Sequence, residues 1–390
     1  MDPFRAFIDA HLQENDLTRL LLRADRFPGI DVSRAVRHIH AIRKLTAKAP
    51  AWARSDLAFS DLLSVEQASS EATALFKAGL FSGRRMADLT GGLGMDAWAF
   101  SRRFAQVDYV EPDWDRARDA RHNFEVLGAP NITVHTATAA QFLAEAADDA
   151  FDLVYLDPSR RDEHDNRVFR FQDCSPNVVE LLDRLLAVSP GVLVKAAPML
   201  DIREARRQLP GVSRVWVVSV RGEVREVLYL LTREHTEERV VALEAVLLGG
   251  KRQGFRFTAE EESSSAAGFG PPGRWLYDPD AAVLKAGAFK CVAARFGLTK
   301  LGADTHLYTS DVPADGFPGR RFLVTAVVRM DKKDVLAALS EPRGNVAVRH
   351  FPMAAEAVRR RLGLADGGED YLFAATLADG SRRVIVGRKA

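Results

Sequence analysis

A glycine-rich turn flanked by acidic residues, Asp88–Asp96, has the residue types and spacing of a ligand-binding loop. Its glycines lack a Cβ, so backbone N–H groups and the start of the next helix can approach a charged ligand closely. Glu111 ends the next strand-like run, and Asp157 follows a later run over 152–156. Three acidic strand ends in this order predict one nucleoside-binding crevice.

Within the turn, we expect Gly91, Gly92 and Gly94 to line an adenosyl ligand. Asp88 would then hold a charged amino group, directly or through water. The structural alternative is a strand-to-helix connection that needs glycine only for its geometry, because such turns are common.

A carboxylate at the tip of the second strand can accept two hydrogen bonds from the 2′,3′-diol of a ribose. Glu111 fits this role, or else it caps the helix that follows Pro112 or complements its dipole. Enzymes that use NAD need the same acid. However, the turn reads G-G-x-G in place of G-x-G-x-x-G, and no second mononucleotide half follows. The sequence therefore disfavours nicotinamide chemistry.

The segment Asp157-Pro158-Ser159-Arg160 follows the fourth predicted strand, beside the same crevice. The carboxylate of Asp157 and a carbonyl near Pro158 can accept hydrogen bonds from a substrate amine and so orient its lone pair. Arg160 can stack on a base or hold a phosphate through its planar guanidinium. The structural alternative is an Asp-Pro turn with solvated arginines.

Lys195 ends the fifth predicted strand. It lies at the crevice, or it is a surface lysine that pairs with an acid such as Asp201. Cys174 does not stand at a strand end, which favours a structural thiol over a nucleophile. The segment 162–176 is a substrate loop or a polar surface loop, and it contains His164, Arg167, Arg170 and Phe171.

The composition is that of an ordinary globular protein with two or three domains. The chain has 390 residues, of which 47% are hydrophobic and 27% are charged, and a net charge of +1 argues against a polybasic binder. Its two cysteines, Cys174 and Cys291, lack CxxC spacing, so we expect no disulfide framework and no metal site. No signal peptide or membrane-spanning run is apparent, which predicts a cytoplasmic protein.

The order of the apolar patterns predicts a helical region followed by an α/β sheet. Residues 1–80 read as helical, and a capping box at Ser64–Gln67 predicts a helix through Ala78 that stops at Gly79. Alternating β and α runs then predict a parallel sheet covered on both faces, with an antiparallel hairpin at its edge. The predicted strands are 85–88, 107–111, 131–135, 152–156, 191–196, 213–219 and 225–231, and the predicted helices are 95–104, 114–127, 139–146 and 178–187.

Residues 258–273 are rich in Glu, Ser, Gly and Pro and predict a linker or a long exposed loop. A helix is expected over Ala281–Phe296. From Phe322 onward, alternating strand and helix patterns predict a small α+β module.

With these residues placed, the chain resembles class I S-adenosylmethionine-dependent methyltransferases, and specifically a bacterial family with a C-terminal THUMP-like domain. The resemblance covers nearly the whole chain and implies four regions: 1–80 helical, 81–234 a seven-stranded methyltransferase sheet, 235–318 ferredoxin-like and 319–390 THUMP-like. The matching motifs are Gln67–Thr73, Asp88–Asp96, Asp157–Arg161, Pro198–Asp201, Tyr277–Ala282, Lys285–Phe289 and Thr305–Ser310.

The resemblance also implies roles for individual residues. The cofactor S-adenosyl-L-methionine would be bound by the turn, with Glu111 on the ribose and Asp157 on the catalytic strand. Related enzymes often place an acid after the third strand for the adenine amine, whereas this chain reads Val134–Ala139, which leaves the backbone or Thr138 for that contact. The turn residues implied in binding are Asp88, Thr90, Gly91, Gly92, Gly94 and Asp96.

The THUMP-like resemblance implies an RNA partner, since THUMP domains serve RNA-modifying enzymes. The net positive charge of residues 319–390 is consistent with an RNA partner, because this region contains fourteen Lys or Arg and eight Asp or Glu. Arg359–Arg361 and Arg382–Arg383 can contact phosphates, or they are solvated side chains of a helix and a strand.

The sequence thus predicts methylation of a base in structured RNA by in-line methyl transfer. The alternatives are a methyltransferase acting on a protein or a small molecule, and a non-catalytic RNA-binding protein that retains the pocket.

Overall fold

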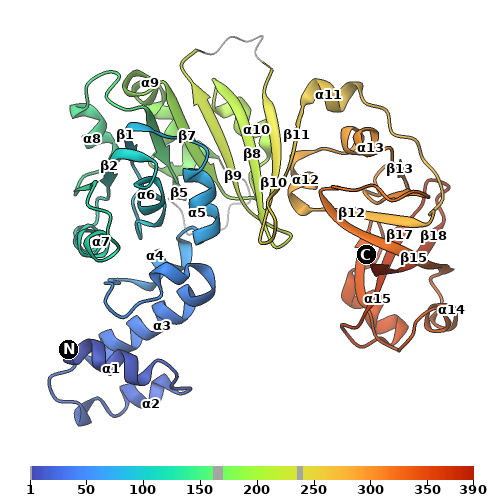
Figure 1. Cartoon of the computed structure of the whole chain (residues 1–390), viewed down its shortest axis with the longest axis horizontal. Coiled ribbons are helices and arrows are strands. Elements are labelled where there is room, and N and C mark those ends of the chain that lie inside the picture. Colours follow the sequence, from blue (N-terminus) through green and yellow to red (C-terminus); the bar gives the residue numbers. More distant parts are fainter. Residues whose placement is uncertain (1, 161–169, 235–239) are drawn as a thin grey trace. The chain divides into compact units, whose positions relative to one another are not determined.

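The computed structural model describes residues 2–160, 170–234 and 240–390, except for the side chain of Arg160. The chain divides into two compact units, the first formed by residues 2–213 and 227–234 and the second by 214–226 and 240–390 (Figure 1). No helix in these ranges is long and apolar enough to cross a membrane.

The first unit begins with the predicted helical region. The single helix predicted from Ser64 to Ala78 is instead two helices. The first, α4, begins after Asp61 and ends at Gln67. Ala68 is extended, and a separate helix, α5, begins after Ser70. Ser64 is therefore inside a helix, and the side chains of Asp61 and Ser70 accept the capping N–H bonds. Gly79 follows the end of α5 as predicted. The helices are α1 (Pro3–His11), α2 (Leu17–Leu21), α3 (Val32–Lys48), α4 (Leu62–Gln67) and α5 (Glu71–Ala78), with 3₁₀ turns η1 (Ala24–Arg26) and η2 (Pro50–Trp52).

Alternating strands and helices follow, as the patterns predict. The strands are β1 (Gly83–Asp88), β2 (Phe104–Val110), β3 (Ile132–His135), β4 (Leu153–Leu156), β7 (Gly191–Ala196), β8 (Val212–Val220) and β9 (Glu223–Thr232). A small ladder pairs β5 (Ser159–Arg160) with β6 (Cys174–Ser175). The helices are α6 (Met95–Phe100), α7 (Trp114–Val126), α8 (Ala139–Glu145), α9 (Val178–Val188) and α10 (Ile202–Gln208), with the 3₁₀ turn η3 (Phe171–Asp173).

The hydrogen-bonded order of the large sheet is β11-β10-β8-β9-β7-β4-β1-β2-β3. Neighbouring β3, β2, β1, β4 and β7 are parallel, and β9 is antiparallel to β7. The chain runs outward from β1 to β2 and β3 and then returns to β4 on the other side of β1. Such a reversal in strand order is where open α/β sheets bind their ligands, outside the carboxyl ends of the strands.

The sheet differs from the prediction in its extent. In the described part of the chain it has nine strands in place of seven, because β10 (Ala242–Leu248) pairs with β8 and β11 (Gln253–Thr258) pairs with β10. The hairpin of β8 and β9 is therefore inside the sheet and does not form its edge.

The segment 258–273, predicted as a linker or loop, contains a helix, α11 (Ala259–Ser264). Glu262 of this helix accepts hydrogen bonds from the backbone N–H groups of Phe289, Lys290 and Cys291. The predicted helix 281–296 is two helices, α12 (Ala281–Ala286) and α13 (Lys290–Phe296), because Gly287 adopts φ +83° and ends the first.

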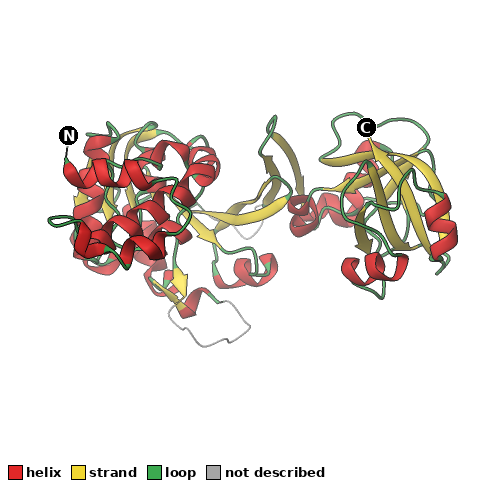
Figure 2. Cartoon of the chain, turned by 90° about the horizontal axis from the view of Figure 1, so that it is seen from below, coloured by secondary structure: helices red, strands yellow, loops and turns green. Residues whose placement is uncertain are grey.

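The predicted C-terminal α+β module is present. The strands β12 (Trp275–Pro279), β13 (Thr299–Lys300), β14 (Tyr308–Ser310), β15 (Gly319–Arg329), β16 (Asn345–Arg349), β17 (Asp370–Thr376) and β18 (Arg382–Lys389) form one sheet. The helices α14 (Lys332–Ala337) and α15 (Ala355–Leu362) contribute Val335, Val358 and Leu362 to a core cluster that includes Leu372 and Val384 of the sheet. Helices (red) and strands (yellow) lie together near the C-terminus in Figure 2. A second core cluster includes Phe322, Phe373 and Ile385.

Asn123 of α7 joins the N-terminal helical region to the sheet's helices. Its Oδ1 accepts from the N–H of Ala58 (2.7 Å), and its Nδ2 donates to the carbonyl of Ala58 (2.9 Å). Asn123 is buried, so these bonds are shielded from water.

We expect Asn123→Ala to lower the free energy of unfolding by about 2 kcal/mol, because both backbone groups of Ala58 lose their partner. Urea unfolding measures this change. Glu125→Ala, at an exposed position of the same helix, is the matched control and should change stability by less than about 0.5 kcal/mol. Equal effects of the two substitutions would contradict the role given to Asn123.

Candidate active site

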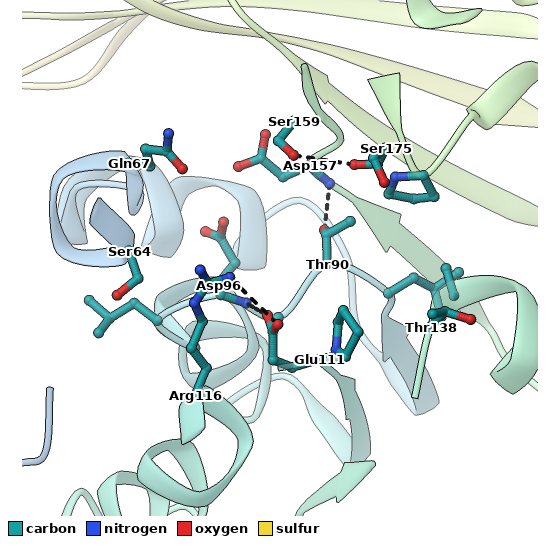
Figure 3. Close-up of a pocket in the computed structure, with 18 of the residues that line it drawn as sticks. Ser64, Gln67, Thr90, Asp96, Glu111, Arg116, Thr138, Asp157, Ser159 and Ser175 are labelled. Atoms are coloured by element: carbon teal, nitrogen blue, oxygen red, sulfur yellow. Dashed lines mark hydrogen bonds and ion pairs between the residues drawn. The ribbon is translucent and has the colours of Figure 1, made fainter. Parts of the chain in front are cut away.

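The three acidic strand ends lie side by side, as predicted. Asp88 is in register with Tyr109 of β2 on one side and with Tyr155 of β4 on the other. A cavity of about 510 Å³ opens above these ends, within the size range of small-molecule sites. In Figure 3, the side chains of Asp96, Glu111 and Asp157 surround this cavity, and Ser64 and Gln67 of α4 bound it on another side.

The glycine turn is fixed by a close approach to β2. A Cβ on Gly91 would lie 2.3 Å from the ring of Tyr109, whose hydroxyl donates to the carbonyl of Gly92 at 2.6 Å. Gly94 has φ +90°, and a Cβ there would meet the ring of Phe124 at 2.7 Å. The turn therefore needs glycine at 91 and 94 for steric reasons, and its three glycines all line the cavity.

Glu111 is held by the backbone on both sides. Its Oε2 accepts from the N–H of Gly92 (2.8 Å) and its Oε1 from the N–H of Asp113 (3.0 Å), while Arg116 Nη1 lies 3.7 Å from Oε1. The cap of α7 is Asp113 and not Glu111. Burial raises the pKa of Glu111 despite these hydrogen bonds. Each oxygen keeps a further lone pair for a ligand.

Thr90 connects the turn to Asp157. The N–H of Asp157 donates to Thr90 Oγ1 (2.7 Å), and both residues line the cavity. Lys195 forms an ion pair with the Asp157 carboxylate. The alternative partner, Asp201, instead caps α10 through the N–H groups of Arg203 and Glu204. The structure thus places Lys195 at the crevice.

Of the residues that follow Asp157, only some line the cavity among those that the structure describes. Pro158 is buried, whereas Ser159 lines the cavity and donates to the carbonyl of Ser175 at 3.5 Å. His164 and Arg167 lie outside the described residues, as does the side chain of Arg160. Cys174 is a buried free thiol that donates to the carbonyl of Arg170, in keeping with a structural role.

Thr138 lines the cavity together with Ala139 and Ala140. Its hydroxyl completes a capping box with Gln141 at the start of α8, because it accepts from the Gln141 N–H and donates to Oε1. The hydroxyl is thus occupied, which favours contact with a ligand through the backbone.

A buried charge network lies behind the turn. Asp96 is 8% exposed, and its Oδ2 accepts from the hydroxyls of Ser69 and Tyr155, both at 2.8 Å. Lys77, which is fully buried, contacts Asp96 Oδ1 at 3.2 Å and donates to Ser69 at 2.9 Å. Burial alone would raise the pKa of Asp96, but the charges of Lys77 and Lys195 and these hydrogen bonds hold it below its usual value.

Asp88 has the opposite electrostatic environment. It is 1% exposed, and its Oδ1 accepts from the N–H and hydroxyl of Thr90. Burial, followed by the negative charge of Asp96, raises the pKa of Asp88 to about 8. Asp88 is therefore largely protonated at neutral pH.

Sequence reasoning assigned no binding or catalytic role to several residues that the structure brings to the cavity. Gln67 and Ser69 belong to the Gln67–Thr73 motif, so their presence in a motif was the available signal. The others carry no local signal, since they reach the cavity only through the fold; they are Ser64, Arg116, Ser175, Asn177 and Glu180.

Known proteins resemble the chain over nearly its whole length. A crystal structure of a methyltransferase from Porphyromonas gingivalis W83 matches with a TM-score of 0.88 and 31% identity, covering 99% of this chain and 97% of that one. Two S-adenosylmethionine-dependent methyltransferases from Mycobacterium tuberculosis, strains CDC 1551 / Oshkosh and ATCC 25618 / H37Rv, are each 29% identical over 343 residues, 87% of this chain and 90% of theirs. Family models match a ferredoxin-like domain at residues 275–318 and a THUMP domain-like region at 319–389.

We expect Gly91→Ala to lower the free energy of unfolding by about 1–3 kcal/mol, because the added methyl group overlaps the Tyr109 ring. Thermal and urea unfolding check this. Gly250→Ala is the control, since an added Cβ at Gly250 has no heavy atom within 4 Å. A Gly91→Ala protein as stable as this control would contradict the steric account.

Asp88→Asn tests the protonation of Asp88. Folding raises the pKa of Asp88, so the protonated carboxyl group stabilises the folded chain. This contribution to the free energy of unfolding is fully present below the unfolded pKa near 3.8 and is lost as pH rises toward 8. Compared with the variant, the wild type should lose up to about 1.4 kcal/mol of stability per pH unit between pH 5 and 8. Urea unfolding at several pH values measures the difference, and parallel stability profiles would argue against a protonated Asp88.

Proposed function

Because the chain belongs to the family of S-adenosylmethionine-dependent methyltransferases with a C-terminal THUMP-like domain, we propose that it methylates a base in structured RNA. The cofactor residues are those of the cavity: the glycines of the turn, Thr90, Glu111 and the backbone at Thr138. We further propose the boundaries 1–80, 81–234, 235–318 and 319–390 for the four regions.

The donor set of the cavity fits S-adenosylmethionine. The glycines of the turn bring its backbone to the cavity, and Glu111 retains acceptor capacity for a ribose diol. When bound, this cofactor supplies an electrophilic methyl group, so the protein must position a nucleophile in line with it.

Asp157 and its partners perform that positioning. Lys195 neutralises and orients the carboxylate, while Thr90 fixes the backbone of Asp157 relative to the turn. The Asp157 carboxylate can accept a hydrogen bond from a substrate amine and direct the nitrogen lone pair toward the methyl group. Ser159, Asn177 and Glu180 add polar groups to this part of the cavity, which suits the polar edge of a base.

The single observation that favours RNA as the substrate is the THUMP domain-like match over 319–389. Exposed basic side chains of this region support it, because phosphate contacts dominate the affinity of proteins for nucleic acids. Within the described residues, no ion pair is formed by Arg329, Lys332, Lys333, Arg360 or Arg382.

The test is to incubate the purified chain with methyl-labelled S-adenosylmethionine and total RNA from cells lacking the protein. We expect RNase-sensitive label in RNA, and a loss of at least 100-fold in rate for Asp157→Ala, because the acceptor is no longer oriented. Arg225→Ala, an exposed change away from the cavity, is the control.

Label found in a protein extract or a small-molecule fraction, and not in RNA, would overturn the RNA assignment while retaining the methyltransferase. Cofactor binding without transfer to any of these fractions would favour a non-catalytic RNA-binding protein.

A further inference from the structure

The polar side chains of the Gln67–Thr73 motif differ in what they contact. Four of them are hydrogen-bonded within the protein, to the buried charge network, at a helix cap or to the backbone; these are Ser69, Ser70, Glu71 and Thr73. The amide of Gln67, in contrast, forms no hydrogen bond with any residue that the structure describes, although its side chain is exposed and lines the cavity. Gln67 is therefore the polar member of the motif that is left to contact a ligand.

The backbone at the end of α4 is fixed from two sides. Lys48 Nζ donates to the carbonyls of the two residues before Gln67, at 2.9 and 2.7 Å. The N–H of Ala68, the next residue, donates to the carbonyl of Ser64 at 3.0 Å. Because the backbone is already held, a ligand that binds the amide has to order only the side chain of Gln67. Little conformational entropy is lost in such a contact, which favours binding.

Asp157 lies on the opposite side of the same cavity. In Figure 3, the amide of Gln67 and the carboxylate of Asp157 extend toward each other from the two sides, and both residues line the cavity. The carboxylate, paired with Lys195, accepts hydrogen bonds, whereas the amide offers two N–H donors and an acceptor oxygen. A molecule between them thus meets an acceptor on one side and a donor–acceptor pair on the other.

This combination matches the edge of a nucleobase. An exocyclic amine can donate to Asp157, while a ring nitrogen or carbonyl beside that amine can accept from the amide of Gln67, as amide side chains do when they read base edges. An isolated amine or hydroxyl has no such neighbouring atom. It would leave the amide unpaired in the closed site, and an unpaired polar group weakens binding.

We propose that Gln67 is a specificity residue whose amide hydrogen-bonds the edge of the acceptor base, beside the amine that Asp157 receives. The inference deepens the proposed function and rests on the acceptor being a base of RNA. It divides the Gln67–Thr73 motif into one residue that contacts the acceptor and four that hold the helices before the sheet in place.

RNA methylation and cofactor binding, measured on the same full-length variants, test the proposal. Gln67→Leu removes the donors and the acceptor of the amide, and Gln67→Glu removes only the donors. Both should lower kcat/KM for undermodified total RNA by about 10- to 100-fold, the factor that a good pair of hydrogen bonds to a base provides. Calorimetry should find that both variants bind S-adenosylhomocysteine as tightly as the wild type.

Leu63→Ala is the matched control. Leu63 belongs to the same helix, is 54% exposed and is not among the described residues that line the cavity. This variant should keep the wild-type rate and the wild-type affinity. Thermal unfolding of all three variants checks that they are folded, and we expect unchanged midpoints because both positions are exposed.

A wild-type rate of RNA methylation in Gln67→Leu would overturn the inference and leave the proposed function intact. An equal loss of S-adenosylhomocysteine affinity in Gln67→Leu would assign the amide to the cofactor and would also overturn it. A wild-type chain that transfers no label to RNA would contradict the proposed function, and this inference with it.

Discussion

The ion pair between Lys77 and Asp96 is the constraint on which the geometry of the site depends. It is buried and joins α5, which precedes the sheet, to α6, which follows the glycine turn. Removing one partner of such a pair is far more destabilising than removing both, because the remaining charge stays in a poorly solvated place. The position of α5 against the turn is consequently set by electrostatics as well as by apolar packing, and with it the wall of the cavity that contains Ser69.

The side chain of Thr90 connects the glycine turn to the end of β4. Thr90 follows Asp88 in the turn and accepts the N–H of Asp157 at the end of β4. The N–H of Leu89 reinforces this link by donating to the carbonyl of Tyr155 at 3.0 Å. A displacement of the turn would therefore also move the backbone of Asp157.

The sequence predicted those parts of the fold and the site that depend on local pattern. The glycine turn, the acidic strand ends and the alternation of strands with helices were all recognisable, because each depends on the types and spacing of residues that are close together in the sequence. The start of α5 was misplaced since Ser64 and Ser70 both have the residue type of a cap, and the extended conformation of Ala68 decides between them. The pairing of β10 with β8, and of Lys77 with Asp96, could not be predicted, because both join segments whose proximity arises only from the tertiary fold.

The location of Lys77 also bears on which segments of this chain can be separated from one another. The cavity is enclosed partly by residues 64–69, and its central carboxylate is paired with a lysine that precedes β1. A gene fusion that took only the sheet, starting at β1, would transfer the glycine turn with an unneutralised acid at its base. The smallest segment that retains the neutralised carboxylate therefore begins before β1 and includes α5 together with the sheet.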